Sequence, residues 1–184
     1  MSSIALKPTV FKTKFATAAL AVIASVALPQ LFHAVGILSG SGNLLGAAFL
    51  PMHLPVLLAA LLGGPVVGLI AGILSPLLSF MLSGMPAATL LPFMVLELAG
   101  YGLVGGLLYK TKLPVIVKLL IAQIAGRAVR ALAVLGAVYL LGVQTVQVSS
   151  IWTMITTALP GIVLQWALIP LLMYRMEGLR KYYV

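Results

Sequence analysis

The chain has 184 residues, of which 62% are hydrophobic and 7% are charged, and its mean hydropathy is +1.22. These values exclude an ordinary soluble domain and indicate that lipid surrounds most of the surface. The net charge of +9 comes from 11 Lys and Arg against two acids, and the lack of cysteine excludes disulfides and thiol chemistry.

Apolar runs of helix length predict an all-α integral membrane protein, a bundle of six transmembrane helices, since a bilayer core of roughly 30 Å needs about 20 apolar residues per helix. We expect the spans at about 13–33, 44–63, 66–83, 91–109, 115–142 and 150–174. No small-residue cleavage site follows the first run, so it is interpreted as a retained helix. No linker is long enough to divide the chain, so residues 1–184 are expected to form a single membrane domain.

The basic residues fall on one side of these spans. Nine of the 11 precede span one, flank the loop between spans four and five, or follow span six: Lys7, Lys12, Lys14, Lys110, Lys112, Lys118, Arg175, Arg180 and Lys181. The three loops on the other side carry none. By the positive-inside rule both termini are expected to be cytoplasmic, which requires an even number of spans. Because this orientation accounts for the charge, no nucleic-acid partner is expected.

Small residues recur at every fourth position in the first three spans. One set is Thr17, Ala21 and Ser25 in span one, and the other is Ala60, Gly64, Gly68 and Gly72 around the turn between spans two and three. Such spacing lets helices approach closely, which is how helices associate in lipid. Packing within the bundle is favoured for the glycine set. For the first helix, self-packing and docking of a partner subunit are equally open.

Three ionisable residues lie inside predicted spans, where a charge is costly enough to need a reason. Glu97 lies 13 residues before Lys110, and Arg127 lies 13 residues after Pro114, so both are about 20 Å from the basic side and able to pair. Arg130 adds a surplus positive charge, and a guanidinium matches a carboxylate in bidentate fashion. We interpret the three residues as part of a site for a carboxylated ligand. The alternative is a structural Glu97–Arg127 pair, with Arg130 reaching water or a partner.

The two histidines have different settings. His33 ends span one and is expected to face lipid headgroups. His53 lies between Pro51 and Pro55, which remove backbone donors and disturb the helix. It is interpreted either as a cavity-wall residue or as a packed histidine bonded to a freed carbonyl. Without neighbouring acids or thiols the histidines predict no metal site.

Other polar and aromatic residues are expected to contribute to a small-molecule pocket open to the outside. Asn43 lies in the first outer loop, and Tyr101 shares the face of Glu97. Gln144 and Trp152 lie at the outer ends of the last two spans. For Trp152 the alternative is a place in the interfacial aromatic belt.

No catalytic constellation is found, so an enzyme is not expected. Gly40-Ser41-Gly42 lies in a loop, and no histidine follows His53 to act as a base for a nucleophile on a later helix. No GxxxxGK[ST] loop is present, so any ATP use must come from partner chains, and no cofactor is expected. Without a paired internal repeat a stand-alone secondary transporter has less support, but it stays open beside a non-catalytic accessory membrane subunit.

The stretch from Phe49 to Tyr109, with FLPMHLPVLLAALLGGPVVGLIAGILSPLLSFMLSGMP and LELAGYGLVGGLLY, resembles the substrate-binding components of energy-coupling-factor (ECF) vitamin transporters. The resemblance implies a high-affinity subunit that captures a vitamin from outside a prokaryotic cell membrane and joins a membrane coupling subunit with two ATPases. It implies ligand contacts at Asn43, Glu97, Arg130, Gln144 and Trp152.

The first helix differs from the pattern of that family. Its first helix often carries an Ala-x-x-x-Ala docking motif, where this chain has Thr17, Ala21 and Ser25. The small size is kept, so these three residues are expected to dock the partner. The surplus positive charge favours a carboxylated vitamin, and the nearest resemblance is to the pantothenate-type subunit. Niacin, biotin and a folate stay open, as do neutral vitamins if Arg130 is structural.

Overall fold

The computed structural model describes the backbone of residues 8–180 and the side chains of residues 12–176, and this part of the chain is helical, without strands. The helices are α1 Pro8–Leu38, α2 Leu44–Phe49, α3 His53–Gly63, α4 Pro65–Ser83, α5 Leu91–Leu107, α6 Val115–Tyr139, α7 Ser150–Thr157 and α8 Leu159–Arg180. The all-α prediction is confirmed.

Five segments are long and apolar enough to cross a membrane: Lys12–Leu38, Leu44–Gly63, Pro65–Ser83, Val115–Tyr139 and Leu159–Met176. Helix α5 is apolar too, and its 17 residues put it at the short end of the range for spanning helices. These six segments correspond in order to the six predicted spans.

The structure differs from the predicted bounds at the first and last spans. Helix α1 continues past His33 to Leu38, because nothing interrupts it before Gly40, whose φ is 72°. The predicted span 150–174 is divided at Ala158 into the short α7 and the long α8. Pro160, the second residue of α8, has no backbone N–H to donate to the preceding turn, so one continuous helix is disfavoured there.

The second span is divided as well, at Leu50. This residue has left-handed backbone angles, φ 48° and ψ 50°, and its N–H donates to the carbonyl of Gly46. Pro51 follows, and a residue before proline is disfavoured in the right-handed helical region. The disturbance expected around His53 therefore falls just before it, and His53 becomes the first residue of α3.

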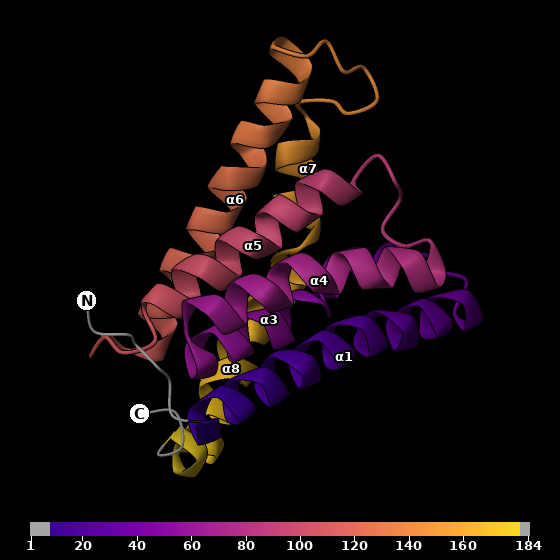
Figure 1. Ribbon diagram of the computed structural model, residues 1–184. Helices are drawn as coiled ribbons and strands as arrows, with labels where there is room; N and C mark the ends of the chain where they lie inside the picture. The colour runs from indigo at the N-terminus through magenta and orange to yellow at the C-terminus, as the bar shows by residue number, and fades with distance from the viewer. Residues whose placement is uncertain (1–7, 181–184) are drawn as a thin grey trace.

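The bundle is narrow at one end and open at the other (Figure 1). The start of α1, the α3–α4 turn, the α5–α6 loop and the end of α8 gather at the narrow end. Toward the other end, α1 and α4 diverge from α6 and α7. The described basic side chains outside the helix centres belong to elements at the narrow end: Lys12, Lys14, Lys110, Lys112, Lys118 and Arg175.

Glycines bring α4 and α5 into close contact along the narrow half of the bundle. A Cβ added to Gly68 would overlap the carbonyl of Gly102, and one added to Gly102 would overlap that of Gly68. Gly72 lies against the carbonyl of Leu98 in the same way. We call Gly68, Gly72, Gly102 and Gly106 the glycine seam. For Gly68 and Gly72, packing within the bundle was the favoured interpretation, and these contacts support it.

The small-residue stripe of α1 faces the chain's own helices. Ala21 is 7% exposed and belongs to the main hydrophobic core, and Ser25 is fully buried. Thr17 is half-buried, and its hydroxyl donates to the carbonyl of Thr13 over 3.0 Å. These contacts correspond to self-packing, one of the two interpretations that the sequence left open for the stripe. A docking role for the same residues stays a prediction.

Candidate functional site

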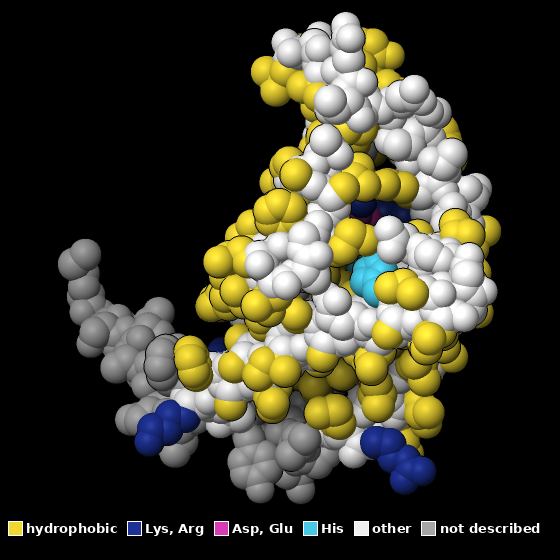
Figure 2. Space-filling view, turned by 90° about the vertical axis from the view of Figure 1, so that its right-hand side faces the viewer, with side chains coloured by type: hydrophobic (Ala, Val, Ile, Leu, Met, Phe, Trp, Pro, Cys, Tyr) yellow, Lys and Arg dark blue, Asp and Glu magenta, His cyan; other side chains and the backbone are white. Residues whose placement is uncertain are grey.

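A cavity of about 400 Å³ lies between the diverging helices at the open end of the bundle. Figure 2 looks toward this end and shows a hollow with basic and acidic side chains at its bottom and a histidine at its mouth. The polar lining residues are His33, Asn43, His53, Ser79, Glu97, Arg127, Arg130, Thr153 and Thr157. The remaining lining residues are apolar. This size and mixture are typical of a site for a small organic molecule.

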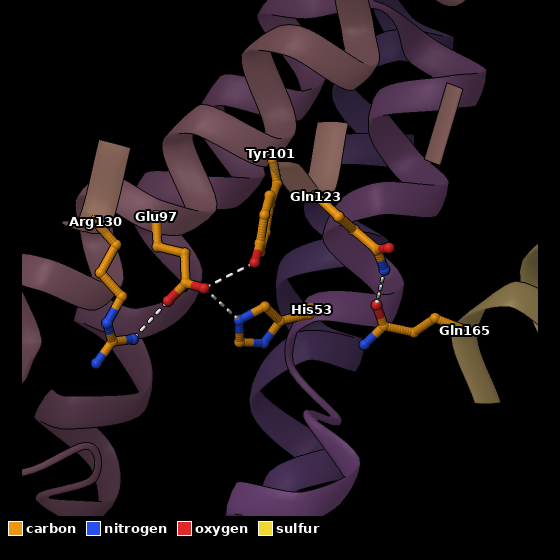
Figure 3. Close-up of polar contacts among 6 residues, drawn as sticks. All are labelled: His53, Glu97, Tyr101, Gln123, Arg130 and Gln165. Carbon is orange, nitrogen blue, oxygen red and sulfur yellow. Dashed lines mark hydrogen bonds and ion pairs between the residues drawn. The ribbon is translucent and has the colours of Figure 1, made fainter. Parts of the chain in front are cut away.

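Glu97 is the centre of a hydrogen-bonded cluster at the inner end of the cavity (Figure 3). The Tyr101 hydroxyl donates to Oε1 of Glu97 over 2.7 Å, and Nη1 of Arg130 donates to Oε2. His53 places its Nε2 3.9 Å from Oε1. Glu97 is 2% exposed, so its charge depends on these partners rather than on water.

Glu97 forms its ion pair with Arg130. The sequence had suggested Arg127 as the partner, because Glu97 and Arg127 were expected at the same depth in the membrane. The reason for the observed pair is the close crossing of α5 and α6 at Gly126. A Cβ on Gly126 would overlap the ring of Tyr101 and approach the carbonyl of Glu97, so this face of α6 is turned to α5. Arg130, four residues later, shares that face, whereas Arg127 is rotated by about 100° from it.

Arg127 lines the cavity beside this cluster. Its Nε is buried and has no hydrogen-bond partner among the described residues. A guanidinium stays protonated, so Arg127 carries a positive charge, and no carboxylate of residues 12–176 lies within salt-bridge distance of it.

Both histidines line the cavity. His53 is 2% exposed, and its ring packs against Tyr101 with centroids 5.4 Å apart. Neither of its ring nitrogens has a hydrogen-bond partner in the part of the chain that the structure describes. The cavity-wall interpretation therefore fits His53, and a bond to a freed carbonyl does not. His33 was expected to face headgroups, but α1 continues beyond it and Gly46 lies against its ring. Its buried Nδ1 also lacks a partner among the described residues.

The other predicted contact residues separate into two groups. Asn43 lines the cavity, and Tyr101 reaches it through its bond to Glu97. Gln144 and Trp152 are exposed and lie outside the lining, and Trp152 is 71% exposed. A contact between either of these two and a ligand stays a prediction.

Two buried polar residues were missed from the sequence. Ser79 is 1% exposed and lines the cavity, and the spacing of Ser75 and Ser79 on an apolar helix was an available signal. Gln123 joins α6 to α8: its Nε2 donates to Oε1 of Gln165 over 2.8 Å, and its Oε1 accepts from the indole N–H of Trp166 over 2.8 Å. Figure 3 shows the amide pair apart from the Glu97 cluster.

The arrangement is suited to holding a molecule with an anionic group. Positive charge and unpaired nitrogens lie at the inner end, and methionine, leucine and proline side chains form most of the apolar part of the wall. Methionine is flexible and polarisable, so it adapts to the shape of a ligand. Within residues 12–176, no group of three His, Cys, Asp or Glu is placed to hold a metal ion.

In a comparison with protein families, residues 15–173 match the model of the ECF transporter, substrate-specific component. No curated protein and no solved structure matches the chain. The family match spans most of the chain and includes every cavity-lining residue.

Proposed function

The chain belongs to the family of ECF transporter substrate-specific components, and on this premise we propose that it captures a small carboxylated vitamin for ATP-driven uptake. Family and apolar helices together make it a multi-pass membrane protein of prokaryotes and a transport subunit rather than an enzyme. In the proposal, a membrane coupling subunit and two ATPase subunits complete the transporter in the cell membrane.

The observation that carries the proposal is the charge of the cavity lining. Two guanidinium groups and one carboxylate line it, so a surplus positive charge remains even with both histidines neutral. Inside a membrane protein an uncompensated charge is costly and is usually matched by a ligand or by another side chain. A carboxylate is the planar anion that a guanidinium fork holds in bidentate fashion.

Pantothenate is the favoured vitamin in this proposal. It has a carboxylate at one end, an amide in the middle, and hydroxyl and methyl groups at the other end. The cavity offers cationic groups at its inner end, apolar wall residues, and polar groups such as His33, Asn43 and Thr153. A volume of about 400 Å³ is sufficient for a molecule of this size. Nicotinate and biotin satisfy fewer of these features, because they lack the hydroxyl-bearing end.

The cavity is proposed to open to the outside. The elements that carry the basic residues outside the helix centres gather at the narrow end of the bundle (Figure 1), which the positive-inside rule assigns to the cytoplasm together with both termini. The mouth of the cavity is at the opposite end. A subunit in this orientation takes its ligand directly from the external solution.

The test is to purify the chain alone in detergent and to identify the co-purifying small molecule by mass spectrometry. Titration calorimetry with pantothenate, nicotinate, biotin and folate follows. We expect one of these acids to bind, pantothenate first, and binding to be lost in a variant with both Arg127→Ala and Arg130→Ala. Arg175→Ala is the matched control, because Arg175 is exposed near the narrow end of the bundle.

Two results would contradict the proposal. One is a wild-type chain that carries no small molecule and binds none of the four acids. The other is a double variant that keeps the wild-type affinity for the acid, because the cationic surplus would then have no part in binding.

A further inference from the structure

Two arginines line the cavity, but their surroundings differ. Arg130 donates to Glu97, and its side chain is 14% exposed. The carboxylate of Glu97 is also held by Tyr101 and lies 3.9 Å from His53. Arg127 has no such partner, and its buried Nε makes no hydrogen bond to a described residue.

We propose that Arg127 is the residue that binds the ligand's carboxylate, and that the Glu97–Arg130 pair is a positioning unit that holds the inner end of the cavity in shape. This assignment rests on the proposed function and deepens it. The charge of the cavity lining does not distinguish Arg127 from Arg130. The proposal gives ligand binding to Arg127 and positioning to Arg130.

The chemistry of the guanidinium supports this division. A carboxylate is held most strongly by two parallel N–H donors, and the Nε edge is one of the two edges that offer them. The Nε of that edge in Arg127 has no hydrogen-bond partner among the described residues. The charge of Arg130 is already offset by a buried carboxylate, so a second anion there would meet the negative charge of Glu97 at short range.

The crossing of α5 and α6 explains why the two roles stay separate. Gly126 fixes the face of α6 that is turned to Tyr101 and Glu97, and Arg130 belongs to that face. Arg127 is one residue after Gly126 and is rotated by about 100° from that face, and it lines the cavity beside the Glu97–Arg130 pair. His53 lines the cavity beside the cluster, and neither of its ring nitrogens has a partner among residues 12–176, so it is available as a second hydrogen-bonding group.

The test compares an acid with its uncharged counterpart. Suitable pairs are pantothenate with pantothenol, nicotinate with nicotinamide, and biotin with biotin amide, and the pair used is the one whose acid binds the wild-type chain most tightly. Calorimetry gives the ratio of the two affinities for the wild type and for Arg127→Gln, Arg127→Lys, Arg130→Gln and Arg175→Gln. A purely structural residue would not change this ratio.

We expect Arg127→Gln to lower the preference for the acid by roughly 10-fold to 100-fold, the range for a lost charged hydrogen bond, with affinity for the uncharged counterpart kept. Retained binding of that counterpart also shows that the variant is folded. Arg127→Lys should keep part of the preference, because it keeps the charge and loses the fork. Arg130→Gln should weaken both ligands together, and Arg175→Gln should change neither.

The assignment is overturned if Arg127→Gln keeps the wild-type preference, or if Arg130→Gln alone removes it. Both results would leave the proposed capture of a carboxylated vitamin intact. A wild-type chain that binds acid and uncharged counterpart equally would instead overturn the carboxylate preference itself, and the Arg127 assignment with it.

Discussion

Replacing Glu97 by glutamine removes the negative charge from the centre of the cluster and keeps the shape of the side chain. The hydrogen bond from the Tyr101 hydroxyl, 2.7 Å long, can still be accepted by the amide oxygen. What is lost is the ionic contact with Arg130. Two uncompensated guanidinium groups would then line the same cavity.

The expected loss of stability follows from the burial of the pair. Removing one partner of a fully buried ion pair costs about 3–5 kcal/mol. The side chain of Arg130 is 14% exposed, whereas that of Glu97 is 3% exposed, so water in the cavity can solvate part of the remaining charge. The expected loss is therefore smaller, about 2–3 kcal/mol. For a chain of this length that lowers Tm by about 5–10 °C.

The assay is thermal unfolding in detergent with and without the vitamin acid. In Glu97→Gln the acid is expected to raise Tm more than in the wild type, because its carboxylate offsets one of two free cations. The uncharged counterpart should raise Tm equally in both chains. The reasoning is refuted if the variant is as stable as the wild type. It is also refuted if the acid stabilises the variant less, because Glu97 would then contact the ligand itself.

Two further predictions concern packing. Gly102→Ala should lower Tm markedly, because the added methyl group meets the Gly68 carbonyl, whereas Gly136→Ala, with nothing within 4 Å of the new atom, should leave Tm equal or higher. Ala21→Leu should destabilise the bundle by about 1–3 kcal/mol, because Ala21 is 7% exposed in the core, while Ala27→Leu on the exposed face should not. An Ala21→Leu chain with wild-type Tm and ligand binding but no assembly with the coupling subunit would favour docking instead.

The fold was largely predictable because its main signal, apolar length, is local. The charge pattern pointed to one basic end, and the basic elements do gather there. The break at Ala158 was harder to predict, because Pro160 was its main signal in the sequence. A proline near a helix start is easily mistaken for one inside a longer helix.

Several of the residues that line the cavity could be predicted from the sequence, but the ion pair between Glu97 and Arg130 could not. Counting residues along each helix gave Glu97 and Arg127 the same depth in the membrane. Such a count does not give the direction in which each side chain leaves its helix. That direction is set by Gly126 against Tyr101, a contact between α5 and α6 that linear spacing does not contain. His33 was misjudged for a related reason: its place in the cavity depends on where Gly46 packs.

The glycine seam has a consequence for how this scaffold can evolve. Its members occupy the narrow half of α4 and α5, whereas the lining residues of these helices, Ser79 and Glu97 among them, occupy the open half. Contacts that hold the two helices together and side chains that line the cavity are therefore encoded by separate stretches of the same helices. Substitutions in the open half can change the cavity lining while the seam preserves the packing of α4 on α5.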